Sequence, residues 1–523
     1  MLDPVSRLFD KRLSALAAAR DPGLLNGGLR GVERECLRVT PEGFIAQTGH
    51  PESLGSALTN RYITTDYSEA LLELITPAQP DIDSTAGFLR DIHQFSVSGL
   101  GDELLWPLSM PCRLRGELDI PIARYGTSNA GRFKSVYRHG LWHRYGRYMQ
   151  AIAGVHFNFS LPDAYWAFQA DLGRSAAPIA DMKSAAYLAV VRNVRRLDWL
   201  LLYLFGASPA VCKCFLPQGK AGLDEFDDES WYAPYATSLR MSEIGYRNER
   251  KTALLVSPNS LDEYVNDLTH AIRTPHPPFE KIGVFADGEY RQLSGNLLQI
   301  EAEFYSTIRP KRSALSGERP TAALRRGGVE YVELRTLDLD PYAATGVSDT
   351  ALRFSEIFLL YCLFAPSPPE YPEEQATIDH NHGLVAHRGR EPGLQLQRDG
   401  VAVSMREWGL ESLRDMRRVA ELLDSSTGKY TAALLECEAR LREPDRTPSA
   451  QLLVDIRASR MSAADFGLDL ARRHKAELLA LGNAGNEHYA LLEVEAQASL
   501  DRQCWIEEHD TLPFEEYLAA YLA

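Results

Sequence analysis

The chain has 523 residues and a formal net charge of −15, and 45% of its residues are hydrophobic. This apolar content supports a large packed core and excludes a disordered chain. The acidic balance argues against a nucleic-acid-binding protein, because contact with a phosphate backbone needs a basic surface.

Apolar residues at three- and four-residue spacing predict helices along much of the chain. Before residue 400 the predicted helices are 5–20, 84–100, 184–205 and about 341–364, with another that follows a turn at 126–131 and runs through Gln150. Beyond Met405 they are 414–423, 430–442, 449–461 and 463–481. Residues 217–230, rich in glycine and aspartate, are predicted to form a surface loop. We therefore expect a catalytic core at 1–400 and a helical extension at 401–523 that packs on it.

Other segments alternate apolar and polar residues, as half-buried strands do. They are 31–39, 70–75, 155–160, 298–305 and 329–335. In each one, acids, amides or a histidine share a single face, because side chains alternate along a strand. The simplest interpretation is a sheet with one packed face and one functional face.

The acids on these strands predict a magnesium site. Magnesium prefers oxygen ligands, and the candidate ligands are Glu33, Glu35, Glu73 and Glu333. Asp66 lies on the approach to the second strand, and His156 can add a nitrogen ligand or hold a carboxylate. Crowded acids repel one another unless cations neutralise them. The alternative is a set of unrelated surface acids, but the same alternation in several segments counts against it.

Arginines complement these acids. Arg335 shares its strand face with Glu333, Arg240 is a second candidate, and a guanidinium grips phosphate or carboxylate in two parallel hydrogen bonds. A basic stretch at 132–147 suggests a small anionic ligand or, alternatively, a solvated basic face. No phosphate-binding glycine loop or dinucleotide fingerprint is present. The residues alone indicate a metal-dependent enzyme that acts on phosphates or carboxylates.

The cysteines and the N-terminus indicate the cytoplasm. Seven cysteines are too few and too scattered for a disulfide framework, which favours a reducing compartment. Cys212 and Cys214 lack the partners of a zinc site, so we interpret them as buried small residues. Residues 1–7 lack an export signal's apolar core, and the most apolar run, 197–212, is too short to span a bilayer. We expect a cytoplasmic protein without membrane contact.

Long strings of the chain resemble the proteobacterial glutamate–cysteine ligase family. Among them are GVERECLRV at 31–39, ITTDYSEALLELITP at 63–77, GVHFNFSLP at 154–162, IRPKR at 308–312 and GGVEYVELR at 327–335. The resemblance is close over about residues 25–345 and weaker beyond them. Strings of this length are far more specific than a short motif.

The resemblance implies an α+β fold related to glutamine synthetase, in which a curved, mainly antiparallel sheet flanked by helices forms a funnel around the active site. It also implies a reaction in which ATP, L-glutamate and L-cysteine give γ-glutamylcysteine, ADP and phosphate. This is the first step of glutathione biosynthesis. The implied cofactor is Mg²⁺, with Mn²⁺ as an alternative, and feedback inhibition by glutathione is expected. We expect a monomer.

The resemblance also assigns residues by position. Metal-site residues of the family match Glu33, Glu35, Glu73, His156 and Glu333. Residues that bind the substrate and the transferred phosphoryl group match Arg240 and Arg335, and Asp66 matches an active-site acid that acts at the metal or cysteine end. The cysteine pocket matches Tyr137, Leu141, Tyr246 and Tyr305, and the glutamate side matches Gln150 and Ile152. Arg335 is implied to stabilise the departing phosphate, and Asp66 or Glu73 to accept the proton of the cysteine amine.

Two alternatives remain open at this stage. One keeps the fold but joins the carboxylate to another amino acid or amine. The other is a catalytically silent protein that senses ATP or thiols, and the retained acids together with Arg335 count against it.

Overall fold

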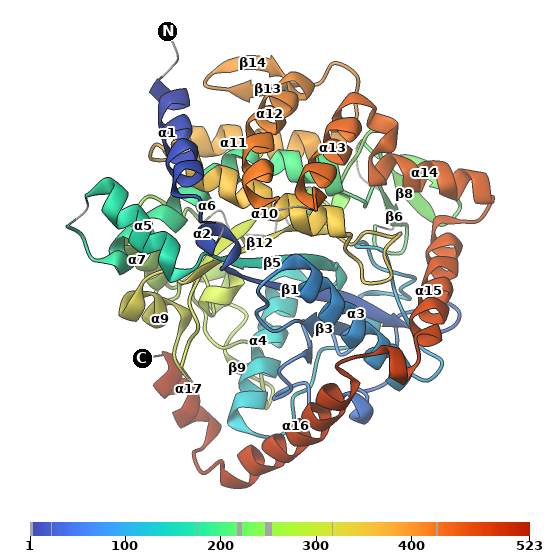
Figure 1. Cartoon of the computed structure of the whole chain (residues 1–523). Helices are drawn as coiled ribbons and strands as arrows, with labels where there is room; N and C mark the ends of the chain where they lie inside the picture. The colour runs from blue at the N-terminus through green and yellow to red at the C-terminus, as the bar shows by residue number, and fades with distance from the viewer. Residues whose placement is uncertain are drawn as a thin grey trace.

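A computed structural model describes residues 4–21, 23–174, 176–216, 222–245, 254–315, 317–424 and 427–522. A seven-stranded sheet organises the fold, in the order β11-β12-β5-β1-β3-β2 with β4 also paired to β1 (Figure 1). Its strands are β1 (Leu29–Val39), β2 (Ile63–Thr65), β3 (Leu71–Ile75), β4 (Leu104–Leu105), β5 (Gly154–Ser160), β11 (Ile308–Lys311) and β12 (Tyr331–Asp338). Every pairing in it is antiparallel, so the predicted α+β class and antiparallel sheet are confirmed.

Helices surround this sheet. Up to residue 388 they are α1 (Pro4–Ala19), α2 (Gly23–Asn26), α3 (Ile82–Gly99), α4 (Asn129–Tyr145), α5 (Asp163–Gly173), α6 (Ile179–Phe205), α7 (Leu261–Ala271), α8 (Pro277–Glu280), α9 (Pro320–Gly327), α10 (Asp349–Phe364) and α11 (Pro372–Arg388). Short strands pair outside the main sheet, as β6 (Ala210–Cys212) with β8 (Ser230–Tyr232) and β7 (Asp224–Asp227), β9 (Phe285–Ala286) with β10 (Glu289–Tyr290), and β13 (Gln395–Arg398) with β14 (Val401–Ser404).

The packed face of the sheet follows from the alternation in its strands. Phe157 of β5 lies opposite Val32 of β1 and Leu334 of β12, and all three side chains are buried. The long helices α6 and α10 cover this face, α6 against β12 and α10 against β5 (Figure 1). Burial of these apolar side chains leaves the polar residues of the same strands on the opposite face.

The C-terminal helices wrap around the molecule. They are α12 (Met405–Leu423), α13 (Lys429–Arg442), α14 (Pro448–Ser459), α15 (Ala463–Ala480), α16 (Tyr489–His509) and α17 (Phe514–Leu522). Figure 1 shows α15, α16 and α17 following one another around the rim to the C-terminus beside α9. The largest hydrophobic cluster includes residues from Phe9 to Ala471. The division at residue 400 therefore stays a prediction, since one core serves both parts.

Three predictions about local structure were wrong. Residues 298–305 form no strand but contain a short 3-10 helix at Glu301–Glu303, because their polar side chains bond to other segments. For example, Glu301 accepts from Thr321 Oγ1 at 2.6 Å. The predicted loop at 217–230 contains the strand β7, and its last residue begins the strand β8. Residues 217–221 of this segment lie outside the described part. The helix expected through Gln150 ends at Tyr145, because Gly146 adopts a positive φ of 83°.

The interpretation of Cys212 and Cys214 as buried thiols was also wrong. The structure joins them in a disulfide, and both are half-buried. The turn after β6 brings their Cα atoms to 5.2 Å, within reach of a bridge. Among the described helices, none is long and apolar enough to cross a membrane.

Candidate active site

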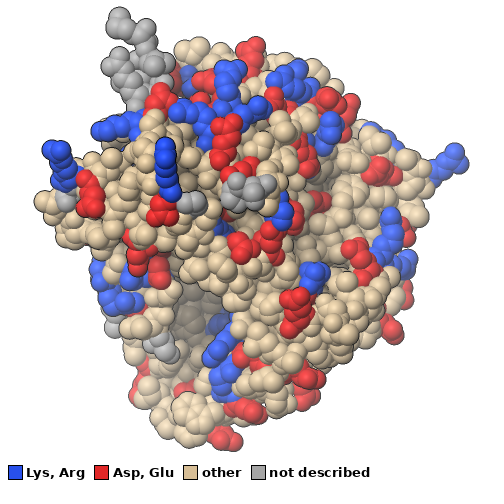
Figure 2. Space-filling model, viewed as in Figure 1, with Lys and Arg blue, Asp and Glu red and all other residues tan. Residues whose placement is uncertain are grey.

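A cavity of about 320 Å³ lies over the polar face of the sheet. Its lining residues are Glu33, Glu35, Asp66, Tyr67, Glu73, Tyr137, Arg138, Leu141, Tyr145, Met149, Gln150, His156, Ala302, Glu303, Tyr305, Arg309, Lys311, Glu333 and Arg335. They come from the five strands β1, β3, β5, β11 and β12, from the turn between β2 and β3, from α4 and the turn after it, and from the segment that precedes β11. Figure 2 shows acidic and basic side chains interspersed over one face of the molecule, without a broad basic area among the residues described there. Inside the cavity, acidic and basic side chains line one shared space.

Strand register brings the predicted acids together. Glu33 lies opposite His156 in the pairing of β1 with β5, and Glu35 lies opposite Glu73 in the pairing of β1 with β3. Glu333 of β12 lies opposite Asn158 of β5. Directly opposed residues on one face are close neighbours, so acids far apart in sequence converge.

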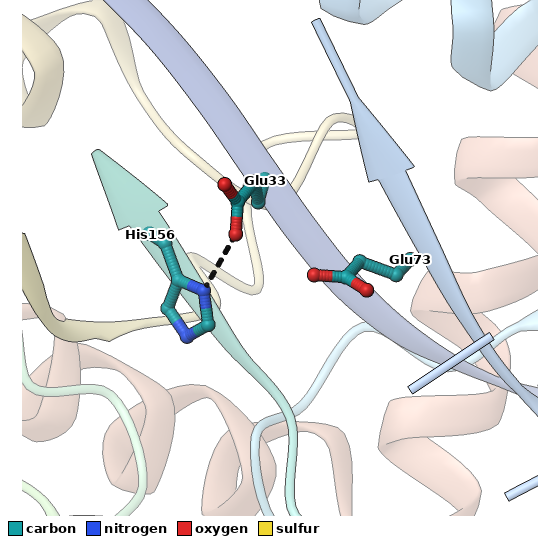
Figure 3. Close-up of side chains that lie close together, drawn as sticks. All are labelled: Glu33, Glu73 and His156. Carbon is teal, nitrogen blue, oxygen red and sulfur yellow. Dashed lines mark hydrogen bonds and ion pairs between the residues drawn. The ribbon is translucent and has the colours of Figure 1, made fainter. Parts of the chain in front are cut away.

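The donor atoms of this group are arranged as a cation would need them. One ligand atom each from Glu33, Glu73 and His156 lies within 4.8 Å of the other two, and Figure 3 shows these side chains pointing toward a shared space. Glu33 Oε2 lies 3.1 Å from His156 Nδ1. Among the described residues, Glu333 Oε2 is buried and has no hydrogen-bond partner. Carboxylate oxygens with one imidazole fit a divalent cation, and the excess of oxygen suits magnesium.

The charges are unevenly balanced across the group. Burial, followed by the carboxylates of Glu33 and Asp66, raises the pKa of Glu73 well above its usual range. Burial also acts to raise the pKa of Glu333, but Lys311 and Arg335 outweigh it and hold that pKa well below the usual range. Around Glu73 the negative charge is therefore only partly offset by Arg335, and a bound cation would offset it further.

Basic side chains gather at the other side. Arg335 Nη1 lies 3.2 Å from Glu333 Oε1. Its Nε is buried, and no hydrogen-bond partner for it lies in the part of the chain that the structure describes. Lys311 Nζ lies 3.4 Å from Glu333 Oε2. Arg309 shares a strand face with Lys311 and also lines the cavity. Cations beside a group of carboxylates suit a phosphate held between them and a metal.

Most of the other expected site residues also line the cavity. Asp66, Tyr137, Leu141, Gln150 and Tyr305 are among the lining residues. They come from the approach to β3, from α4 and the turn after it, and from the segment before β11. The structure thus brings residues expected at the cysteine and glutamate subsites into the same space as the acids.

Arg240 and Ile152 are placed differently. Arg240 is buried behind the cavity, where it donates to Asp338 Oδ1 at 2.9 Å and to the carbonyl of Leu337 at 2.6 Å. Ile152 belongs to a hydrophobic cluster with Met149. Tyr246 lies outside the described residues.

Several lining residues were not predicted as individual site residues, namely Arg138, Tyr145, Met149, Glu303, Arg309 and Lys311. Arg138 was noted only within the basic stretch and Glu303 only on the polar face of 298–305. A further signal existed for Arg309 and Lys311, since they are two residues apart in a β-prone string and share a face. For the helical residues Arg138 and Tyr145, spacing from Tyr137 and Leu141 gave a weaker signal.

The glutamate–cysteine ligase family model matches residues 13–385, which is more than half of the chain. The chain belongs to this family. A glutamate–cysteine ligase of Alcanivorax borkumensis is 46% identical over 520 residues, covering 98% of this chain and 99% of the relative. One from Pseudomonas putida is 47% identical over 521 residues, covering 99% of each. The family membership that the sequence strings predicted is confirmed.

A solved structure agrees with the fold. The crystal structure of glutamate–cysteine ligase from Francisella tularensis in complex with AMP has a TM-score of 0.88 and 35% sequence identity. The match covers 95% of this chain and 97% of that one. Since 95% of this chain aligns, most of its C-terminal helical region is part of the shared fold.

Proposed function

We propose that the chain is a glutamate–cysteine ligase, which joins the γ-carboxylate of L-glutamate to the amine of L-cysteine and converts ATP to ADP and phosphate. The observation that carries this proposal is the cavity in which the sheet's carboxylates face Arg335 and Lys311, in a chain of this family. The AMP bound by the Francisella relative supports ATP as the nucleotide. The product is the first intermediate of glutathione biosynthesis.

The acids of the sheet would hold magnesium, with manganese as an alternative. Glu33, Glu35, Glu73, His156 and Glu333 supply the donors. When bound, the metal neutralises charge on the phosphates of ATP and orients the terminal phosphoryl group. The chain's own part is to keep these donors in place, as Asn158 does by donating to Glu33 Oε1 at 2.9 Å.

The reaction would begin when the γ-carboxylate of glutamate attacks the terminal phosphorus of ATP. The bond to ADP breaks and an acyl phosphate forms. Arg335, with its buried and unpartnered Nε, would bind the oxygens on which charge develops. Lys311 lies beside Glu333 and would hold a phosphate oxygen from the same side.

The amine of cysteine would then attack the acyl carbonyl and release phosphate. The amine must first lose a proton, and Asp66 and Glu73 both line the cavity as acceptors. Tyr137, Leu141 and Tyr305 would surround the cysteine side chain, while Gln150 lies on the glutamate side. Arg240 and Ile152 would support the glutamate subsite from behind. These side chains would exclude water and so protect the acyl phosphate from hydrolysis.

A coupled assay of ADP release tests the proposal. Purified chain is incubated with ATP and glutamate, with and without magnesium, and with cysteine, 2-aminobutyrate or ammonia as acceptor. We expect ADP and γ-glutamylcysteine with cysteine and magnesium, and much slower turnover with ammonia. A preference for another amine would favour a related carboxylate–amine ligase, and no ADP with any acceptor would favour a silent binding protein.

Three further properties belong to the same proposal. Glutathione would occupy both amino-acid subsites, so we expect inhibition that is competitive with glutamate. We also expect a monomer, and a location in the cytoplasm. Inhibition kinetics test the effect of glutathione, and sedimentation in the presence of substrates tests the monomer.

A further inference from the structure

The C-terminal residues 503–522, here called the C-terminal strap, hold the beginning of α4. Asp510 accepts from the backbone N–H of Asn129 through Oδ2, and from Asn129 Nδ2 through Oδ1 at 2.8 Å. Glu507 Oε1 accepts from the backbone N–H of Thr127 at 2.8 Å. Amide groups at a helix start have no partner within the helix, and they carry partial positive charge. Two acids of the strap therefore anchor this end of α4.

The approach of the strap to α4 is close. Gly126 has a φ of 81°, and a Cβ atom at this position would overlap Glu507 and the Gln503 amide. A glycine is needed here both for its backbone conformation and for the space it leaves. The close contact therefore depends on the glycine of the turn as well as on the side chains of the strap.

The helix α17 also joins α4 to a second segment. Phe514 and Leu518 of α17 are buried in one cluster with Val136 of α4 and Leu293. The ring of Phe514 lies 5.0 Å from that of Tyr290. Because α4 and residues 290–300 share these apolar contacts, α17 packs the two segments against each other (Figure 1).

The helix α4 and the residues that directly follow the second segment form one wall of the cavity. Tyr137 and Leu141 come from α4, and Glu303 and Tyr305 follow the second segment. Tyr145 donates to Glu303 Oε1 at 2.7 Å, and Gln299 Nε2 donates to the carbonyl of Tyr137 at 3.2 Å. Tyr137 also packs against the cluster that contains Phe514. A direct chain of contacts leads from the strap to this wall.

We propose that Asp510 and α17 position this wall and so set how tightly the enzyme holds the acceptor amino acid. This inference rests on the proposed function, in which the wall surrounds the side chain of cysteine. Asp510 is a positioning residue, since it contacts Asn129. The side chains that would hold the metal and the phosphates lie on β1, β3, β5, β11 and β12, and the strap lies outside these strands.

The test compares two neutralised acids of the strap. Asp510→Asn places an amide donor against the donors of Asn129, whereas Glu516→Gln changes an exposed acid of α17, in the same strap. We expect Asp510→Asn to raise KM for cysteine about tenfold, because a hydrogen bond to a charged group is lost. KM for ATP and kcat should stay within about twofold, and Glu516→Gln should behave as the wild type.

A rescue variant and a truncation sharpen the test. The double change of Asn129→Asp with Asp510→Asn restores a donor opposite an acceptor, and we expect it to recover part of the affinity for cysteine. Removal of residues 510–523 should raise KM for cysteine more than Asp510→Asn does. Circular dichroism melts show whether each variant is folded.

An unchanged KM for cysteine in folded Asp510→Asn would overturn the inference. So would a parallel rise of KM for all three substrates, or a loss of kcat alone, since these would mark the strap as merely structural. If the truncated chain fails to fold, Asp510→Asn and its rescue decide. Failure of the wild type to make γ-glutamylcysteine would instead refute the proposed function, so the two failures are distinguishable.

Discussion

Replacement of Arg335 by lysine tests the assignment of this residue to the developing phosphate charge. The guanidinium pairs with Glu333 through Nη1 at 3.2 Å, while its Nε is buried without a hydrogen-bond partner. A lysine can keep the charge pair, but it has no second donor fixed in the same plane. The change therefore removes a donor and leaves the charge.

The size of the effect follows from what is lost. Removal of one preorganised donor to transition-state charge costs roughly 10²- to 10³-fold in kcat, which is about 2.7–4 kcal/mol. Since Glu333 keeps a cationic partner, the free energy of unfolding should change by no more than about 1 kcal/mol. Turnover and stability should thus respond very differently.

The assay is kcat for ADP release at saturating substrates, with the melting temperature measured in parallel. Arg326→Lys is the matched control, because Arg326 is exposed on α9, where it pairs with Glu318. Near-native turnover of Arg335→Lys would refute the reasoning. An unfolded variant would show that the residue is structural.

Three other predictions concern single side chains. Glu33→Gln should lower kcat by at least about 10²-fold and lower the melting temperature slightly while the chain stays folded, because burial and Glu333 act to raise the pKa of Glu33 but His156 and Lys311 outweigh them and hold it below its usual range; a variant that unfolds would contradict this. Asp338→Asn should destabilise the chain by about 3–5 kcal/mol in urea unfolding and raise KM for glutamate, since buried Arg240 loses its carboxylate; an unchanged urea midpoint would refute it. Burial and Arg34 hold the pKa of His93 well below its usual range. Below about pH 6.5 the imidazole is therefore protonated in the unfolded chain but not in the folded one, and the free energy of unfolding decreases as the pH is lowered. Relative to His93→Leu, the wild type should lose about 1.4 kcal/mol per pH unit in that range, and parallel pH profiles would contradict it.

The sequence predicted the chemistry of the sheet well, because alternation is a local property. Glu33 and Glu35 had to share a face once 31–39 was a strand, and the apolar partners of His156 identified the packed side. Register is not local. That Glu33 lies opposite His156, and Glu333 opposite Asn158, depends on pairings between segments more than a hundred residues apart.

Alternation also misled at 298–305. The side chain of Gln299 accepts from the backbone N–H of Leu293, and that of Glu303 accepts from Arg144 and from the backbone N–H of Gln299. These side-chain hydrogen bonds take the place of the backbone hydrogen bonds that a strand would form with a neighbouring strand. The role of the C-terminal helices could not be predicted either. The contact of Asp510 with Asn129 joins residues 381 positions apart, and no pattern in the sequence links the two.

The central claim is that the acidic face of the sheet binds a divalent cation in the same cavity as Arg335. Manganese binding, followed by electron paramagnetic resonance of purified wild-type chain and of Glu33→Gln and Glu333→Gln, tests it most directly. The account predicts a bound signal in the wild type whose affinity falls by more than about tenfold in each variant. Equal manganese binding by all three proteins, or none by the wild type, would contradict it.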